Sequence, residues 1–145
     1  MIIKTLTEMP SVTMVDGCFD PIHQGHVAYF EAAAAFGDDV FCFVAADKYI
    51  STKHPVLLPG EDRICVINAF RNVQICNLGN CSTAEALSVV KPKRYVKGAD
   101  WKIKGLPQNE IQICNTLGIE IIFVDTTLNS SSRLIERLRD QNDTP

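Results

Sequence analysis

Strand-like and helix-like segments alternate along this chain, and this alternation restricts its fold more than any other feature. Val40–Ala45 is a near-continuous apolar run, typical of a strand that is buried on both faces. Gly60–Phe70 places apolar residues at Ile64, Ile67 and Phe70, at the spacing of one helix face. The alternation recurs about five times, which indicates βαβ units and a Rossmann-like, doubly wound parallel sheet in an α/β fold.

The spacing of apolar residues and the positions of turn residues predict where each strand and helix begins and ends. Strands are expected at Val12–Val15, Val40–Ala45, Val73–Cys76, Arg94–Val96 and Ile119–Val124. Helices are expected at Gly25–Phe36, Gly60–Phe70, Ser82–Val90, Gln108–Leu117 and Ser130–Arg139, with loops at Ala46–Pro59 and Gly98–Pro107. Parallel sheets of this kind bind ligands beyond the carboxyl ends of their strands, so the loops that follow strands are the first place to search.

Length and charge narrow the class of protein. A chain of 145 residues suits one domain, with a core expected over about residues 11–140. The net charge of −3 does not favour binding to nucleic acid, and no apolar run approaches the roughly 18 residues of a membrane span. Because Met1–Pro10 also lacks the apolar core of a signal peptide, we expect a cytoplasmic protein. The cysteines form no C-x-x-C pair and have no second pair or histidine cluster to complete a zinc site, so no metal site is expected.

The loop of residues 17–26 joins the first strand to the first helix and reads G-C-F-D-P-I-H-Q-G-H. A helix start offers free N–H groups that suit phosphate, and Gly17 lets the backbone approach a ligand closely. His23 and His26 lie three residues apart, so one helical turn places both on the same face, with Gly25 leaving room between them. Two imidazoles there can donate hydrogen bonds to phosphoryl oxygens. The spacing alone also fits a metal pair or two solvated side chains.

A second feature favours an anionic ligand. Residues 91–104 contain six cationic side chains against the single acid Asp100, namely Lys91, Lys93, Arg94, Lys97, Lys102 and Lys104. In a chain of net negative charge, this is a local concentration of positive charge beside a predicted site loop.

The pattern G-x-F-D-x-x-H-x-G-H resembles the signature of the cytidylyltransferase-like nucleotidyltransferases. Three later stretches resemble further motifs of that family in the same order. They are Glu61–Ile67, which resembles its arginine-bearing helix, Val96–Trp101, which resembles K-G-G-D-[YW], and Asn129–Ile135, which resembles a serine- and threonine-rich segment. The resemblance extends over residues 12–138.

The resemblance implies roles for the first loop and for a lysine. His23 and His26 would bind the triphosphate and stabilise the transition state, while Cys18 and Phe19 would cradle the nucleotide through backbone N–H groups. Lys53 would steady the phosphates, with Lys48 as its competitor. For either lysine, a solvated loop charge is the alternative interpretation.

The later motifs imply contacts with both substrates. Arg63 would contact the phosphorylated acceptor, unless it forms a surface salt bridge with Glu61 or Asp62. In the K-G-A-D-W loop, the resemblance implies that the nucleotide is bound by Lys97, Gly98, Asp100 and Trp101. Asp100 would contact the ribose or the base, and Trp101 would pack against one of them or belong to the core. The last motif supplies Ser130, Ser131 and Ser132, which would cap the final helix and bind the nucleotide.

The family reaction is attack by a substrate phosphate oxygen on the α-phosphorus of a nucleoside triphosphate, with Mg²⁺ bridging the phosphates and pyrophosphate leaving. The stretch from Lys97 to Glu120 most resembles the adenylyltransferase domain of ADP-heptose synthases, which implies ATP and heptose 1-phosphate. Glycerol-3-phosphate cytidylyltransferases carry R-T-x-G before the last helix, where this chain has Asp125–Leu128. The difference favours ATP over CTP.

Other interpretations remain open at this point. A different sugar or polyol phosphate fits the motifs, and a non-catalytic nucleotide-binding module would share the fold. Adenylylation of pantetheine phosphate or nicotinamide mononucleotide shares the first motif, but the K-G-A-D-W loop argues against it. The resemblance also implies a homodimer. Asp16 and Asp20 receive no role from the sequence.

Overall fold

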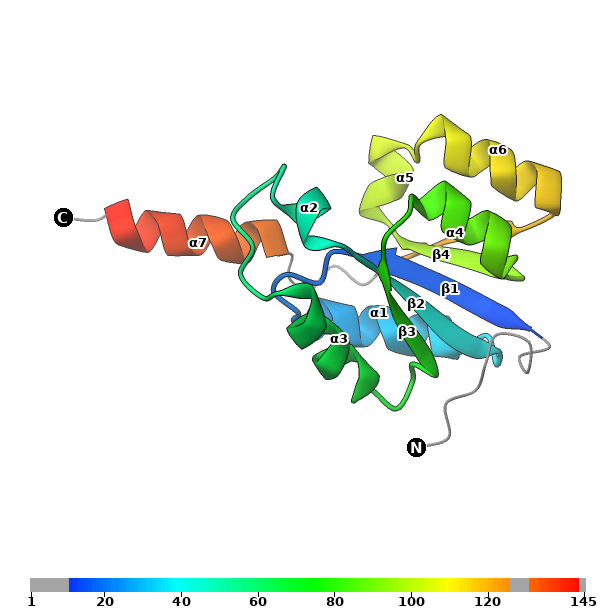
Figure 1. Cartoon of the computed structure of the whole chain (residues 1–145), viewed down its shortest axis with the longest axis horizontal. Helices are drawn as coiled ribbons and strands as arrows, with labels where there is room; N and C mark the ends of the chain where they lie inside the picture. Colours follow the sequence, from blue (N-terminus) through cyan, green and yellow to red (C-terminus); the bar gives the residue numbers. More distant parts are fainter. Residues whose placement is uncertain (1–10, 126–130, 144–145) are drawn as a thin grey trace.

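A computed structural model of the chain describes residues 11–125 and 131–143. Its centre is a parallel sheet of five strands in the order β3-β2-β1-β4-β5 (Figure 1). The strands are β1 (Val12–Gly17), β2 (Asp39–Ala45), β3 (Ile75–Gly79), β4 (Arg94–Gly98) and β5 (Glu120–Val124). The helices are α1 (Gln24–Ala34), α2 (Asp47–Ile50), α3 (Gly60–Asn68), α4 (Thr83–Val90), α5 (Asp100–Lys104), α6 (Gln108–Leu117) and α7 (Ser131–Asp143). The α/β, doubly wound prediction is confirmed.

The strand order places the switch point of the sheet between β1 and β4. From β1 the chain builds outward to β2 and β3, and then crosses to the other side for β4 and β5. The register aligns Val15 with Cys42 on one side and with Val96 on the other, so these strands end near one another. A crevice forms at this edge because the connections leave the switch point in opposite directions.

Alternate strand residues supply two separate hydrophobic cores, one on each face of the sheet. Val15, Cys42 and Val96 belong to the core that α1 and α3 cover. Met14 and Tyr95 belong to the core beneath α4 and α6, on the opposite face (Figure 1). Since successive strand residues point to opposite faces, strands covered on both sides read as continuous apolar runs.

Two expected loops contain short helices. The segment Ala46–Pro59 includes α2, because Ile50 is fully buried and its two prolines follow the helix rather than interrupt it. Likewise, Gly98–Pro107 includes α5, which ends at Gly105 with a φ of 80°.

The third strand begins later than Val73–Cys76, at Ile75. The pairing with β2 starts there, while Gln74 uses both its backbone N–H and its side-chain oxygen to bond the backbone of Val40. Helix α1 runs over Gln24–Ala34 rather than Gly25–Phe36.

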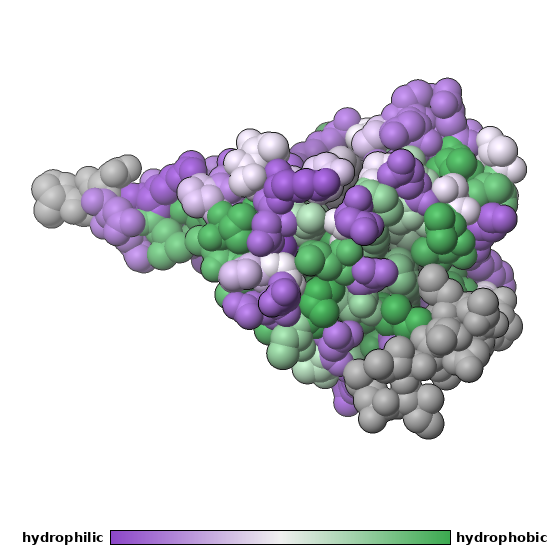
Figure 2. All heavy atoms as spheres, viewed as in Figure 1, coloured by the Kyte–Doolittle hydropathy of each residue, from purple (hydrophilic) through white to green (hydrophobic). Residues whose placement is uncertain are grey.

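The surface reflects the same layering. Figure 2 shows hydrophilic atoms over most of α7, whereas hydrophobic atoms gather across the middle of this face, around the edge strand β3. Helix α7 extends away from the sheet (Figure 1). Among the described residues, no helix combines the length and the apolar character needed to cross a bilayer.

Candidate functional site

A cavity of about 1060 Å³ opens at the carboxyl ends of β1 to β4. The predicted site residues that line it are Gly17, Cys18, Phe19, His23, Gly25, His26, Lys53, Lys97, Gly98, Asp100 and Trp101. They come from the ends of β1 and β4, from the segments that follow β1 and β2, and from the first turns of α1 and α5. The N-terminal turn of α4 and residues near the start of α6 complete the walls.

His23 and His26 form a reciprocal cap at the start of α1. His23 is the N-cap residue, and its Nδ1 accepts the N–H of Gly25 at 3.0 Å, while Nδ1 of His26 accepts the N–H of His23 at 3.2 Å. The two rings stack with their centroids 3.9 Å apart. A neutral imidazole that accepts at Nδ1 carries its proton at Nε2, so each ring keeps one N–H to offer a ligand.

This cap changes what the helix start offers to an anion. The sequence predicts free backbone N–H groups there, but the N–H groups of His23 and Gly25 are bonded to the imidazoles. The helix start therefore presents imidazole N–H groups in place of these two amides.

Burial keeps both imidazoles neutral, and repulsion from His23 adds to this effect at His26. Burial lowers the pKa of His26 to about 3, with a smaller contribution from the nearby charge of His23. Burial also lowers the pKa of His23. Around neutral pH both side chains are therefore hydrogen-bond donors without a net charge.

The ring of Phe19 packs against the ring of His26. The Phe19 side chain is buried, and its ring meets the ring of His26 edge to face with centroids 4.9 Å apart. Phe19 has a φ of 54°, which turns its side chain over Gly17. A Cβ at Gly17 would lie 3.1 Å from Cζ of Phe19, so the missing side chain at Gly17 makes room for this ring. The sequence suggests that Gly17 makes room for a ligand, whereas in the structure the Phe19 ring fills this space.

Lys97 is bound to Asp16 on the floor of the cavity. Lys97 Nζ lies 2.6 Å from Asp16 Oδ1, and the two side chains are 6% and 10% exposed. The ammonium also lies 4.4 Å from the centroid of the Trp101 ring. Lys97 is therefore held by its own chain, and a phosphate would meet a paired lysine rather than a free one.

A tyrosine links this pair to a second carboxyl group. The hydroxyl of Tyr95 lies 2.8 Å from Oε1 of Glu110 and 3.1 Å from Oδ2 of Asp16. A hydroxyl has one proton, so it can donate to only one of them at a time. Burial raises the pKa of Glu110, and a protonated Glu110 could donate to Tyr95 while Tyr95 donates to Asp16.

The loop after β4 forms one wall of the cavity. Trp101 is half-buried, with Lys97 and Lys104 both within cation–π range of its ring. Asp100 is exposed, and its carboxylate lies 3.9 Å from Lys104 Nζ. A Cβ at Gly98 would lie 2.7 Å from the carboxylate of Asp100, so Gly98 lets that side chain fold back toward the strand end.

The two competing lysines differ in position. Lys53 lines the cavity with an exposed side chain. Lys48 is not among the cavity residues, and its ammonium lies 5.3 Å from the centroid of the Tyr49 ring. The geometry thus favours Lys53 as the lysine that can reach a ligand.

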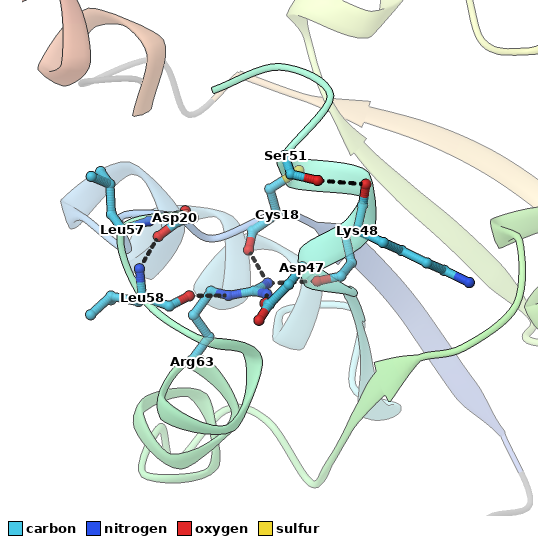
Figure 3. Close-up of polar contacts among 9 residues, drawn as sticks. Cys18, Asp20, Asp47, Lys48, Ser51, Leu57, Leu58 and Arg63 are labelled. Carbon is cyan, nitrogen blue, oxygen red and sulfur yellow. Dashed lines mark hydrogen bonds and ion pairs between the residues drawn. The ribbon is translucent and has the colours of Figure 1, made fainter. Parts of the chain in front are cut away.

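Arg63 does not occupy the position predicted from the sequence. It is 1% exposed, lies outside the cavity wall, and directs its guanidinium to oxygens of its own chain (Figure 3). Its ion pair is with Asp47, neither with Glu61 nor with Asp62. Both expectations for Arg63 are therefore corrected, because folding buries this face of α3 against the loops beneath the cavity.

The serine motif falls partly outside the described residues. Ser130 lies in an undescribed stretch, and Ser131 and Ser132 belong to the first turn of α7, with side chains that are not described. The predicted nucleotide contacts of these serines remain predictions.

Within the described ranges, no group of three or more His, Cys, Asp or Glu side chains is arranged to hold a metal ion. Asp16 is already paired with Lys97, and both carboxylate oxygens of Asp20 accept backbone N–H groups. The engaged carboxylates of Asp16 and Asp20 therefore do not fit a resident Mg²⁺ ion.

Several residues of the cavity are not among those predicted from the sequence. Tyr29, Thr83 and Glu110 all line it, and Asp16 forms its floor. Thr83 follows the β3 strand, so the rule that loops after strands carry the site could have pointed to it. No local pattern pointed to Asp16, whose partner Lys97 lies 81 positions away.

Comparison with known proteins identifies the family of this chain. The cytidylyltransferase-like family matches residues 14–137. A "Bifunctional protein HldE" from Alkalilimnicola ehrlichii is 28% identical over 138 residues, covering 92% of this chain and 28% of that protein. A "FAD synthase" from Methanosarcina acetivorans is 33% identical over 88 residues, covering 60% of this chain and 58% of that protein. The chain thus spans 28% and 58% of the length of these relatives.

A solved structure shares the fold. The lipopolysaccharide core biosynthesis protein from Thermoplasma volcanium superposes with a TM-score of 0.68 and 24% identity, over 79% of this chain and 96% of that one. At this level of identity, the similarity concerns the fold alone. The family match covers most of the chain and includes both histidines of the cavity. The chain therefore belongs to the cytidylyltransferase-like family of nucleotidyltransferases.

Proposed function

We propose that this chain transfers a nucleoside monophosphate from a nucleoside triphosphate to a small phosphorylated acceptor and releases pyrophosphate. The observation that carries the proposal is the reciprocal cap of His23 and His26, which leaves two neutral N–H donors at the wall of a cavity large enough for two ligands. Neutral donors at a helix start suit the oxygens of a triphosphate.

The chemistry requires no nucleophile from the protein, because the acceptor phosphate supplies the attacking oxygen. That oxygen forms a bond to the α-phosphorus while the bond to the β-phosphate oxygen breaks, and pyrophosphate leaves. His23 and His26 would donate from Nε2 to phosphate oxygens, and Lys53 would supply positive charge at the same rim. Mg²⁺ bound to the phosphates would neutralise part of their charge.

For the substrates, we propose ATP in preference to CTP and heptose 1-phosphate as the acceptor. The R-T-x-G sequence of glycerol-3-phosphate cytidylyltransferases is absent, and the relatives include HldE proteins and FAD synthases. Because some relatives are FAD synthases, a flavin phosphate should be tested as an acceptor beside the sugar and polyol phosphates. A homodimer remains a prediction, as does the alternative of a non-catalytic nucleotide-binding module.

The test is pyrophosphate release in the presence of Mg²⁺, with ATP and CTP each combined with heptose 1-phosphate, glycerol 3-phosphate and flavin mononucleotide. Turnover with ATP and heptose 1-phosphate is expected. Turnover with CTP and glycerol 3-phosphate alone would replace the leading substrates with the cytidylyltransferase alternative. Nucleotide binding without turnover on any acceptor would favour the non-catalytic module.

A further inference from the structure

Two buried charged residues lie beneath the cavity and have no part in the reaction proposed above. Asp20 is fully buried in the loop after β1, and Arg63 of α3 is 1% exposed. Neither lines the cavity. A buried charge is costly unless its hydrogen-bonding groups are satisfied, so the partners of these two side chains show what they hold together.

Asp20 ties the loop after β1 to the segment that precedes α3. Its Oδ2 accepts the N–H of Leu57 at 2.9 Å, and its Oδ1 accepts the N–H of Leu58 at 2.7 Å. Both oxygens of the carboxylate are thus engaged by neighbouring backbone groups. These charge-assisted bonds fix the position of residues 57–58 relative to the loop.

Arg63 binds the same region from the other side (Figure 3). Its Nε donates to the carbonyl of Leu58 at 2.9 Å, and its Nη1 donates to the carbonyls of Cys18 at 2.7 Å and Ala45 at 2.6 Å. Its Nη2 donates to Oδ1 of Asp47 at 2.6 Å. One side chain therefore connects the loop after β1, the end of β2, helix α2 and the segment before α3.

These bonds form a closed circuit, which we name the Asp20–Arg63 brace and define as Asp20, Leu58, Arg63 and Cys18. Asp20 binds the N–H of Leu58, and Arg63 binds the carbonyl of that same residue. Arg63 also binds the carbonyl of Cys18, two positions before Asp20 in the chain. Because the circuit is closed, the loop and the segment cannot separate without exposing a buried charge or an unpaired carbonyl.

The brace joins the two loops that carry the groups expected to meet the triphosphate. His23 follows Asp20 by three positions, and Lys53 lies between helix α2 and the braced residues Leu57 and Leu58. Both His23 and Lys53 line the cavity, yet they come from loops of different strands. The positions of these donors relative to each other therefore depend on what joins the two loops.

On the basis of the proposed function, we propose that Asp20 and Arg63 are positioning residues for the nucleotide. The Asp20–Arg63 brace holds the segment that carries Lys53 against the histidine loop, so that the histidines and Lys53 bind the same triphosphate. Neither side chain touches the nucleotide.

A double-mutant cycle with MgATP as the probe separates this role from simple stabilisation. Asp20→Asn keeps the size of the side chain but can accept only one of the two N–H groups, and we expect the Kd for MgATP to rise at least tenfold by calorimetry. In a Lys53→Ala background the same substitution should raise the Kd less than threefold, because the lysine that it positions is gone. Arg63→Lys should behave like Asp20→Asn.

Asp38→Asn is the matched control. Asp38 forms a half-buried ion pair with Arg94 at the opposite end of the sheet, away from the cavity. This control should lower stability and leave the Kd for MgATP unchanged. The proposal would be overturned if Asp20→Asn and Arg63→Lys bound MgATP as the wild type does, or if their effects were equally large without Lys53.

Hydrogen exchange tests the brace without relying on nucleotide binding or on a folded variant. In the ligand-free wild type, the amides of Leu57 and Leu58 should exchange slowly although Leu57 itself is exposed. Rapid exchange at both amides would overturn the brace. Slow exchange together with no binding of MgATP by the wild type would instead overturn the proposed function, and the nucleotide-positioning role with it.

Discussion

Asp16 Oδ1 and Lys97 Nζ form a buried ion pair of 2.6 Å that joins the ends of β1 and β4. These are the two strands between which the order of the sheet reverses, so the pair lies at the switch point where the cavity opens. Its position gives Asp16 a role that no local sequence pattern suggested. The carboxylate fixes the lysine of the K-G-A-D-W loop and neutralises its charge before a ligand arrives.

Asp16→Ala should strongly destabilise the protein, because it leaves the Lys97 ammonium buried without its partner. Breaking a buried pair from one side costs about 3–5 kcal/mol in free energy of unfolding. Urea denaturation would measure this loss. Lys104→Ala provides the contrast, since it removes an exposed pair with Asp100 and should cost at most about 0.5 kcal/mol. Similar small losses for both variants would show that the buried pair contributes no more than a surface one.

The capping and donating roles of His23 should be separable by substitution. His23→Ala removes the N-cap of α1, at a cost of about 1 kcal/mol of stability. His23→Asn retains an acceptor in place of Nδ1 but lacks the Nε2–H donor. We therefore expect near-wild-type stability in urea for His23→Asn, together with a 10²- to 10³-fold loss of pyrophosphate release in either variant. A fully active His23→Asn would contradict the donor role.

Stability should fall as the solution is acidified from pH 7 toward pH 5, and His26 should contribute to this fall. Its pKa is about 3 in the folded protein because of burial, whereas the unfolded chain takes up the proton near pH 6.5. The unfolded state therefore binds more protons below pH 6.5, and the contribution reaches at most about 1.4 kcal/mol per pH unit.

The measurement is urea denaturation of the wild type and His26→Asn across this pH range. Asparagine retains an acceptor for the N–H of His23 but does not titrate, so its stability should depend less on pH than that of the wild type. Equal dependence in the two proteins would show that His26 titrates normally in the folded state. Measuring above pH 5 limits the contribution of the carboxylates.

The contribution of Glu110 to stability should depend on pH in the direction opposite to that of His26, and Glu110→Gln should remove it. Burial raises the pKa of Glu110 in the folded protein, so the folded state retains a proton that the unfolded chain releases. The wild type therefore loses stability as pH rises through the unfolded value toward the folded one. Glutamine stays neutral, and its amide can donate to Tyr95 as a protonated Glu110 does. The stability of Glu110→Gln minus that of the wild type should therefore be larger at pH 8 than at pH 5. Thermal unfolding at the two pH values would show this, and no change in the difference would refute it.

Local sequence patterns are enough to predict the class of fold and to single out the histidine loop. The apolar runs and helical spacings are local patterns, and burial on both faces of a parallel sheet imposes them directly. The histidine motif is local as well, since three residues of spacing suffice to place both imidazoles on one turn of α1. Short helices such as α2 carry too few residues to show a period, so that segment was predicted as a loop.

Which charged groups meet depends on the packing of distant segments and cannot be predicted from local patterns. Lys97 reaches Asp16 across 81 positions, and Asp20 reaches Leu58 across 38, because strand order and loop packing bring these segments together. Spacing along the chain carries no information about such pairs. For the same reason the sequence suggests Arg63 as a substrate ligand, whereas in the structure Arg63 is buried and bonds backbone carbonyls of its own chain. Its charge is satisfied by carbonyls that only the folded chain assembles around it.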